Sequence, residues 1–421
     1  MPSFPLTLSL VFTVATITAW IIFVGLAELT GAHIGLIPDA NSSLPKERLF
    51  ELTRSTVTAA GLLAGVFAIV YAYRKQRIEE AASLRADSET LGARYQTAAE
   101  QLGHDRAAVR LAGIYALSRL ADDDSTQRET ICRLLCAYLR ISYDPHDPPP
   151  GEREVRLTAI KVIAEHLQNP AAETTWCGID LDFSGARFDG GSFAGAHFTS
   201  GAVNFSGCDF THGTISFDHA TFSGATVNFG SGDDPPAVFS GAQVLFTGAH
   251  FRDGIISFIF SEFRRGEIAF GGAFFGGSRV SFGSCILESA DLSFGGPIWS
   301  GAKFAAGRVS FAGAELRGGF MSFMGVDFCG THVDLDIHLT GTSILFDEAY
   351  FTSGVISIGE AEIRGGTISF DGAHAPERIF DSWPLPAPPS ESRAKNKKVT
   401  KRKTSRAPKS RERAKRNDDG A

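Results

Sequence analysis

Hydrophobic positions follow three different patterns along the chain. Leu6 to Ala27 and Ser55 to Tyr73 are two long stretches without a charged residue. From Arg74 to Leu167 apolar residues recur at helical spacing, and from about Gly178 to Ala373 short apolar pairs alternate with polar residues. A change of period from 3.6 to 2 indicates helices followed by short strands.

The two uncharged stretches predict a transmembrane hairpin over residues 1–73. The first has about 22 residues, and at about 1.5 Å per residue it crosses one hydrocarbon core. A cleaved signal peptide is the alternative, but the stretch starts without Lys or Arg and no small-residue cleavage site follows. Neither stretch carries a charge at depth, so an anchor is expected rather than a transport path.

Basic residues predict the orientation of the hairpin. Arg74, Lys75, Arg77 and Arg85 follow the second stretch, and the positive-inside tendency places them in the cytoplasm. Two spans then put both termini inside, with a short external loop between the spans. Lys46, in that loop, makes the charge bias modest.

Residues 74–175 are expected to form a helical segment. The sequence VRLAGIYALSRL from Val109 recurs as VRLTAIKVIAEH from Val155, 46 residues later. A period of about 40–47 residues is typical of HEAT or armadillo helix pairs. An ordinary helical bundle is the alternative, since two copies make only a short layer.

From residue 176 to 383 phenylalanine recurs at short, regular spacings. The first copies, five residues apart, are Phe183, Phe188, Phe193 and Phe198. Later steps alternate between five and seven, and a small or aliphatic residue stands two positions before most copies, as Val203 does before Phe205. A residue and its second neighbour point to the same side of an extended segment, so each short strand contributes two inward side chains.

These units resemble the pentapeptide-repeat family, whose pattern A-(D/N)-(L/F)-x-x is matched by Ala186 to Gly190. The resemblance implies a right-handed quadrilateral β-helix with stacked Phe and Ala or Val residues inside. The alternating steps predict a coil of about 24 residues, as 5+7+5+7, with two widened corners. The fold class is therefore α+β with several domains: the hairpin, the HEAT-like segment, the β-helix and a basic tail.

The sequence also makes predictions about two interruptions of the phenylalanine spacing and about the ends of the β-helix. Phe229 to Phe246 and Phe294 to Phe311 are each 17 apart, which indicates five inserted residues. The sequence GSGDDPP is expected to form a loop in the first insertion and Phe304 to fill the second. Trp299 is expected in the Phe series, Trp176, Phe380 and Trp383 at the two ends, and the helical segment over the first coil.

The predicted register, which decides the residues that face inward, can be tested at single positions. Phe258 and Phe270 are expected to face inward, each touching ladder mates one coil away. Ser257 and Ala269, one residue before them, are expected to face outward, because a shift of one residue moves a side chain from core to water.

The last segment, residues 384–421, is predicted to be a disordered basic tail. It carries thirteen Lys and Arg after Ser392 and few apolar residues, so it lacks the material for a core. Anionic lipids, nucleic acid and solubility alone are all left open as its role. The repeat region has about 21 acidic and 9 basic residues, so the tail could also be attracted to it.

Residue patterns for catalysis or metal binding are weak. Asp334, Asp336 and His338 alternate along one predicted strand, where three ligands on a convex surface make a poor metal site. Cys132 and Cys136 share a helix face, but core packing explains them better than a metal does. We therefore expect no catalytic, cofactor-binding or metal-binding residues, no cofactor and no enzyme activity.

The predicted function is that of a non-enzymatic scaffold, anchored in the membrane, whose cytoplasmic β-helix binds other proteins. The order of segments resembles membrane-bound pentapeptide-repeat proteins of bacteria, which implies the bacterial cell membrane. The alternative is a DNA mimic that modulates DNA gyrase or another DNA-binding protein, as in soluble members of the family. The expected partners are an unknown protein and membrane lipids, without a small-molecule substrate, and a homo-oligomer is left open.

Overall fold

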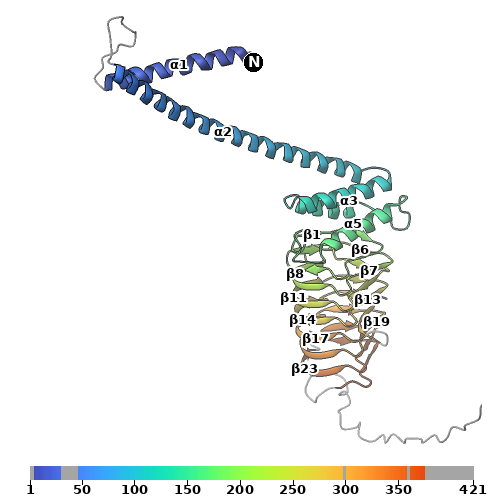
Figure 1. Cartoon of the computed structure of the whole chain (residues 1–421). Coiled ribbons are helices and arrows are strands. Elements are labelled where there is room, and N and C mark those ends of the chain that lie inside the picture. Colours follow the sequence, from blue (N-terminus) through green and yellow to red (C-terminus); the bar gives the residue numbers. More distant parts are fainter. Residues whose placement is uncertain (1–3, 30–45, 297–299, 358–360, 375–421) are drawn as a thin grey trace, which may run out of the picture. The chain divides into compact units, whose positions relative to one another are not determined.

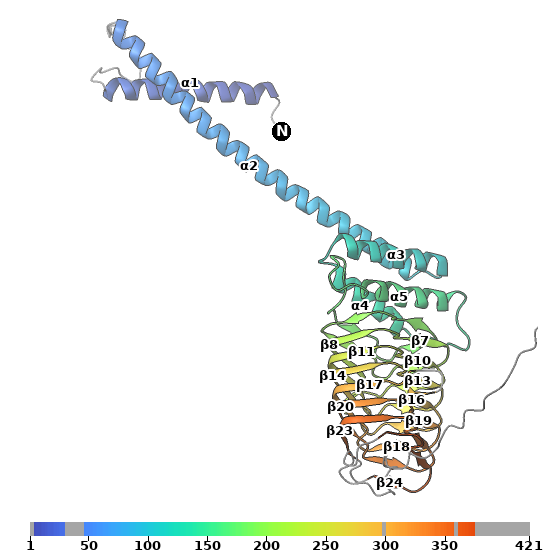
Figure 2. The ribbon, with the colours of Figure 1, turned by 60° about the horizontal axis from the view of Figure 1, so that its bottom comes forward.

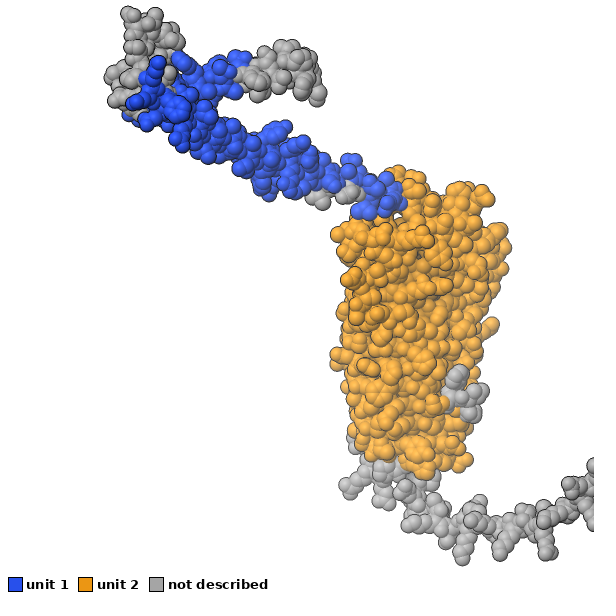
Figure 3. All heavy atoms as spheres, viewed as in Figure 1, with its two compact units in different colours: residues 1–94 blue, residues 95–421 orange. Residues whose placement is uncertain are grey.

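The computed structural model describes residues 4–29, 46–296, 300–357 and 361–374. It divides into two compact units, residues 1–94 and 95–421, which Figure 3 shows in two colours. The predicted basic tail, Phe380, Trp383 and Trp299 lie outside the described residues.

The first unit is built from two helices, α1 (Phe4–Leu29) and the first part of α2 (Lys46–Leu102). Ala27 of α1 and Leu52 of α2 are buried together, and Phe23 and Leu26 pack against them. α2 runs on for 57 residues without a break. The boundary expected after residue 73 therefore falls inside a helix.

One helix in the described part of the chain is long and apolar enough to cross a membrane, Phe50–Ser83 within α2. Thr13–Leu29 in α1 is a shorter apolar helix. Large apolar side chains of α2 are exposed, among them Phe67 at 73% and Ile69 at 71%. A run of exposed apolar side chains on one helix is unfavourable in water and compatible with lipid.

Three more helices open the second unit, α3 (Ala107–Asp123), α4 (Arg128–Arg140) and α5 (Glu152–His166). The two copies of the VRL sequence form α3 and α5, which pack against each other. Gly113 allows α3 to cross the end of α2 closely, because a Cβ there would lie 2.7 Å from the backbone nitrogen of Leu102. We call α3, α4 and α5 the helical layer.

Parallel strands then stack into three sheets, visible from two sides in Figures 1 and 2. Sheet A consists of β1 (Leu181–Asp182), β5 (Ala202–Asn204), β8 (Thr221–Gly230), β11 (His250–Phe258), β14 (Phe274–Ser281), β17 (Lys303–Ser310), β20 (Asp327–Asp334) and β23 (Tyr350–Ser357), with β4 (His197–Phe198) beside β8. Sheet B consists of β2 (Arg187–Phe188), β6 (Asp209–Phe210), β9 (Val238–Phe239), β12 (Glu262–Phe263), β15 (Ile286–Leu287), β18 (Ala314–Leu316), β21 (Ile337–Leu339) and β24 (Glu362–Ile363). Sheet C consists of β3 (Gly191–Ser192), β7 (Thr214–Ser216), β10 (Gln243–Leu245), β13 (Glu267–Ala269), β16 (Asp291–Gly295), β19 (Phe320–Phe323), β22 (Ser343–Leu345) and β25 (Thr367–Ser369).

Phenylalanine rings fill the space between the sheets in vertical stacks. Phe258 lies between Phe229 and Phe282, with ring centroids 4.4 and 4.7 Å away and the rings nearly parallel. It meets Phe270 edge to face across the core at 6.5 Å. Stacked and edge-to-face rings are the favoured arrangements of aromatic pairs. The inward positions predicted for Phe258 and Phe270 are therefore confirmed.

Coil lengths follow the spacing of the stacked rings. Phe258 and Phe282 are 24 residues apart, as predicted. The first coil, from Phe183 to Phe205, has 22 because three of its four steps are five residues. Coils with an insertion have 29, as from Phe229 to Phe258.

Phe304 corrects the predicted second insertion. Its ring stacks on Phe275 at 4.4 Å and on Phe328 at 5.1 Å. Phe304 is thus a regular ladder residue, at the place that the sequence predicts for Trp299, and the inserted residues come before it in the chain. The sequence prediction was wrong because Trp299 and Phe304 are both aromatic and lie five residues apart, so the spacing alone could assign either of them to the ladder.

The two widened corners of a coil differ. At one, the strands of sheet A bend and continue, and glycines such as Gly354 take a positive φ of 102°. A Cβ on Gly354 would lie 2.6 Å from the carbonyl oxygen of Thr331, so the coil beneath leaves no room for a side chain. At the other corner sheet B ends and sheet C begins.

Five-residue corners have their own hydrogen bonds. A Ser, Asn or Asp just before the ladder residue accepts from the backbone N–H two positions on, as Ser281 does from Gly283 at 3.3 Å. Ser257 does the same and also donates to the carbonyl oxygen of Gly230 at 2.6 Å. Its hydroxyl thus has two partners, and the side chain is only half-buried.

Ala269 does not face water as expected. It is fully buried, and its methyl group lies between Leu245 and Ser293 in one row of sheet C. A methyl group is short enough to be covered by its neighbours even on the outer side of a strand.

The helical layer covers the first coil, as predicted. α5 lies against β3, where Ile160 comes within 3.0 Å of the Cβ position of Gly191. Trp176, predicted at this end, is fully buried and stacks on His166 at 4.2 Å. The open end of the β-helix is thereby closed by protein.

Candidate interaction surfaces

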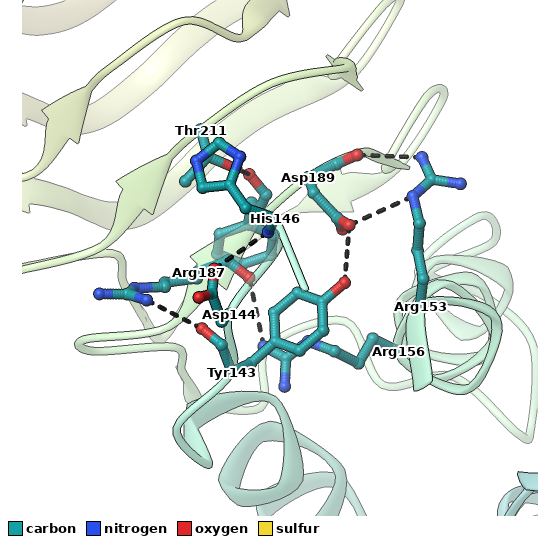
Figure 4. A network of polar contacts seen from close by, with 9 residues as sticks. Tyr143, Asp144, His146, Arg153, Arg156, Arg187, Asp189 and Thr211 are labelled. Atoms are coloured by element: carbon teal, nitrogen blue, oxygen red, sulfur yellow. Dashed lines mark hydrogen bonds and ion pairs between the residues drawn. The ribbon is translucent and has the colours of Figure 1, made fainter. Parts of the chain in front are cut away.

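A polar network joins the helical layer to the first coil (Figure 4). Asp189, two per cent exposed, directly follows β2 and accepts from the hydroxyl of Tyr143 at 2.8 Å. Arg153 of α5 donates to the same carboxylate at 3.2 Å and to the Asp189 carbonyl oxygen at 3.0 Å. Burial and the Asp189 carboxylate raise the pKa of Tyr143. Asp189 is thus a satisfied structural group.

Two buried arginines occupy the same place in the two VRL copies. Arg156 donates to the carbonyl oxygens of Leu139 at 2.5 Å and Arg187 at 3.2 Å, with its guanidinium over the Tyr143 ring. Arg110 donates to His104 and Asp105 carbonyl oxygens and pairs with Glu152 at 2.9 Å. Both arginines bind backbone carbonyl oxygens of neighbouring segments, since buried carbonyls need donors. Their partners were not foreseen, because the repeat identifies equivalent positions but not contacts.

Sheet B presents charged side chains in two outward rows. Glu and Arg flank the ladder residue on β12, β18 and β24, and within each strand the arginine binds the glutamate. These pairs are Glu262–Arg264 at 2.6 Å, Glu315–Arg317 at 2.5 Å and Glu362–Arg364 at 2.8 Å. The side chains are exposed or half-buried, so each pair adds little stability but remains accessible to other molecules.

Sheet A presents most of the basic side chains of the central coils. Lys303 lies 3.4 Å from Asp327, and Arg308 lies 3.7 Å from Asp334. Arg279 stands beside Arg308 in the same row. The acidic excess of the repeat region is therefore not spread evenly over its faces.

The candidate metal residues do not come together. Asp334 ends β20, whereas His338 belongs to β21 and lies 3.8 Å from Glu362. A corner with buried Leu335 separates them. The described part of the chain contains no group of three or more His, Cys, Asp or Glu placed to hold a metal ion.

The cysteine pair lies in the core of the helical layer. Cys132 and Cys136 of α4 are both buried. Their mutual hydrogen bond, together with burial, raises the pKa of Cys132. A buried thiol with a raised pKa is a poor nucleophile and a packing residue.

Two hollows in the described residues lie beside the charged side chains described above. One of about 610 Å³ lies in the helical layer between Arg110, Tyr138 and Ile141. One of about 240 Å³ lies on sheet B between the pairs of β18 and β24. Charged side chains line both hollows.

Comparison with known proteins identifies the repeats. Residues 173–231 match the family model "Pentapeptide repeats (9 copies)". The chain thus contains pentapeptide repeats. The same stacked rings continue past the matched residues to Phe370, which lies 4.9 Å from Phe346. No curated protein and no solved structure matches the chain.

The family model covers the first coils of the β-helix. Its repeat explains the ladder residues and the small residues before them, as the sequence predicted. The helical layer lies before the matched range, and its interpretation as a HEAT-like pair stays a prediction.

Proposed function

We propose that this pentapeptide-repeat protein is a non-enzymatic scaffold anchored in the bacterial cell membrane. Its β-helix lies in the cytoplasm and offers outward rows of side chains to a protein partner. The observation that carries the proposal is the contrast between a uniformly apolar interior and varied polar rows at fixed spacing on the sheets. Solenoids with such faces are suited to binding other proteins.

The membrane part of the proposal rests on two features. α2 exposes large apolar side chains along Phe50–Ser83, and α1 contributes the apolar Thr13–Leu29. We place both as spans with the termini inside, because Arg74, Lys75 and Arg77 follow the apolar part of α2.

Fractionation tests the anchor and its orientation. Carbonate extraction of native membranes should leave the full-length chain in the pellet, because an inserted hairpin does not depend on ionic contacts. Protease added outside intact cells should spare the β-helix. Release into the carbonate supernatant would reject the anchor, and external digestion of the β-helix would reject the orientation.

The DNA-mimic alternative has less support. Its basis is the acidic excess of the repeat region, about 21 acidic against 9 basic residues. On sheet B, however, arginines alternate with glutamates, and on sheet A Arg279, Lys303 and Arg308 interrupt the acidic side chains. A continuous acidic surface of duplex width is what a DNA mimic needs. Gyrase supercoiling assays with the full-length protein should therefore show no inhibition.

A further inference from the structure

One position on sheet B breaks the charge pattern of its row. The row that follows the ladder residues reads, coil by coil, Arg264, Glu288, Arg317, Thr340 and Arg364. Glu288 thus stands between two arginines, Arg264 and Arg317. Thr340 also stands between two arginines, Arg317 and Arg364, but brings no negative charge.

We infer that the slot over Thr340 accepts a carboxylate from an acidic side chain of the protein partner. This inference rests on the proposed scaffold function and names the chemistry of its partner. The Glu288 slot is the internal reference, because there the chain places its own carboxylate between two arginines. At Thr340 the same arrangement lacks its central charge.

The shape of the slot agrees with this assignment. A hollow of about 240 Å³ opens there, lined by Glu315, Arg317, His338, Thr340, Glu362 and Arg364. Ligand pockets for small molecules are usually about 300–1,000 Å³, so the hollow is sized for one side chain. The shorter Thr340 forms its floor, with its hydroxyl donating to the Leu316 carbonyl oxygen at 3.3 Å.

Donors remain available in the slot. Arg317 binds Glu315 through Nε and Nη2, and Arg364 binds Glu362 through Nη2. A guanidinium has five N–H donors, and the Arg364 side chain is 75% exposed. Two arginines that flank a carboxylate give charge-assisted hydrogen bonds, which are about twice as strong as neutral ones.

The row before the ladder residues orients the partner. It places His338 between Glu315 and Glu362, the two glutamates that bind Arg317 and Arg364. A bound carboxylate is therefore directed toward Thr340 and away from His338. A neighbouring basic or amide group of the partner would face the glutamates.

A titration followed at His338 tests the slot. The full-length protein in neutral detergent is titrated with N-acetyl-glutamate methylamide, and the ring signals of His338 are followed by NMR. N-acetyl-glutamine methylamide is the uncharged control probe. We expect saturable shifts at His338 with the glutamate probe only, weakened at least fivefold by T340E, which fills the slot, and by R317Q with R364Q. T340S, which leaves the slot open, and R264Q, outside the slot, are the matched controls and should leave the affinity within about twofold.

Every other outcome overturns either the inference or the proposed function. Equal shifts with sodium acetate or inorganic phosphate would indicate an adventitious ion only. Equal weakening by R264Q would mean that general charge, not the slot, binds the probe. If the titration fails while crosslinking from native membranes still recovers a partner, the scaffold stands and the slot is rejected. If the titration succeeds and crosslinking recovers nothing, the slot stands and the proposed function is rejected.

Discussion

The interior of the β-helix and its junction with the helical layer are held together differently. Inside, the same contact repeats: a ring on a ring about 24 residues away, as for Phe246 and Phe270 at 4.8 Å. At the junction each contact occurs once, between Asp189, Tyr143, Arg153 and Arg156. A repeated apolar contact spreads stability along the coils, whereas a single polar network concentrates it at one place.

The largest expected effect comes from the interior. Changing Phe258 to Ala removes a fully buried ring with stacked neighbours on both sides, which costs about 3–5 kcal/mol. Hydrogen exchange of the full-length chain should accelerate in β8, β11 and β14 and stay unchanged in the helical layer. Ser257→Ala, which loses two hydrogen bonds, should cost about 1 kcal/mol. Equal damage by both substitutions would show that the register is wrong.

The next effect comes from the junction. Arg156→Met leaves the buried carbonyl oxygens of Leu139 and Arg187 without this donor, which costs about 2–4 kcal/mol. Exchange should accelerate in α4, α5 and β2 and not in β14. Arg133→Met, which removes an exposed pair with Glu129, should cost less than about 1 kcal/mol. Loss spread evenly over all coils would contradict the contrast between the two regions.

Alkaline pH should weaken the helical layer before the interior. Burial and neighbouring carboxylates raise the pKa of both Tyr143 and Tyr138. Their neutral forms thus stabilise the fold below about pH 10, the ordinary pKa of tyrosine, and this contribution is lost as the pH rises further. The loss is at most about 1.4 kcal/mol per pH unit for each phenol. Melting temperatures from pH 8 to 11 should fall less steeply for the Tyr138→Phe, Tyr143→Phe double variant; identical slopes would refute this.

The smallest effect is a gain. Phe260 holds a positive φ of 61° at a five-residue corner where most coils have glycine, and its side chain is 45% exposed. Phe260→Gly should stabilise the chain by about 0.5–1 kcal/mol, because a bulky residue is strained in this conformation. Gly313→Ala, at the equivalent corner with φ of 70°, should destabilise it. A loss of melting temperature for Phe260→Gly would mean that the ring contributes packing that outweighs the strain.

The sequence predicted the interior well because repetition makes the evidence redundant. The spacing of Phe246, Phe258 and Phe270 alone determines which side chains face inward and how long a coil is. The sequence-based prediction failed at Phe304, which could belong either to the ladder or to the insertion. It also failed at Ala269, because a small outward side chain is covered by its neighbours. The junction could not be predicted, because Asp189 and Tyr143 are 46 residues apart and no repeated pattern links them. The slot over Thr340 became visible only once the strand register aligned the rows of sheet B.

Site-specific photocrosslinking in native membranes tests the central claim, that the outward faces of the β-helix bind a protein. A photoreactive residue would replace exposed Arg264 on sheet B, Gln243 on sheet C or Thr352 on sheet A in the full-length chain. The account predicts that at least one face yields the same crosslinked protein reproducibly, and that the product is lost without irradiation. Irradiation that gives no protein adduct from any of the three faces would contradict it.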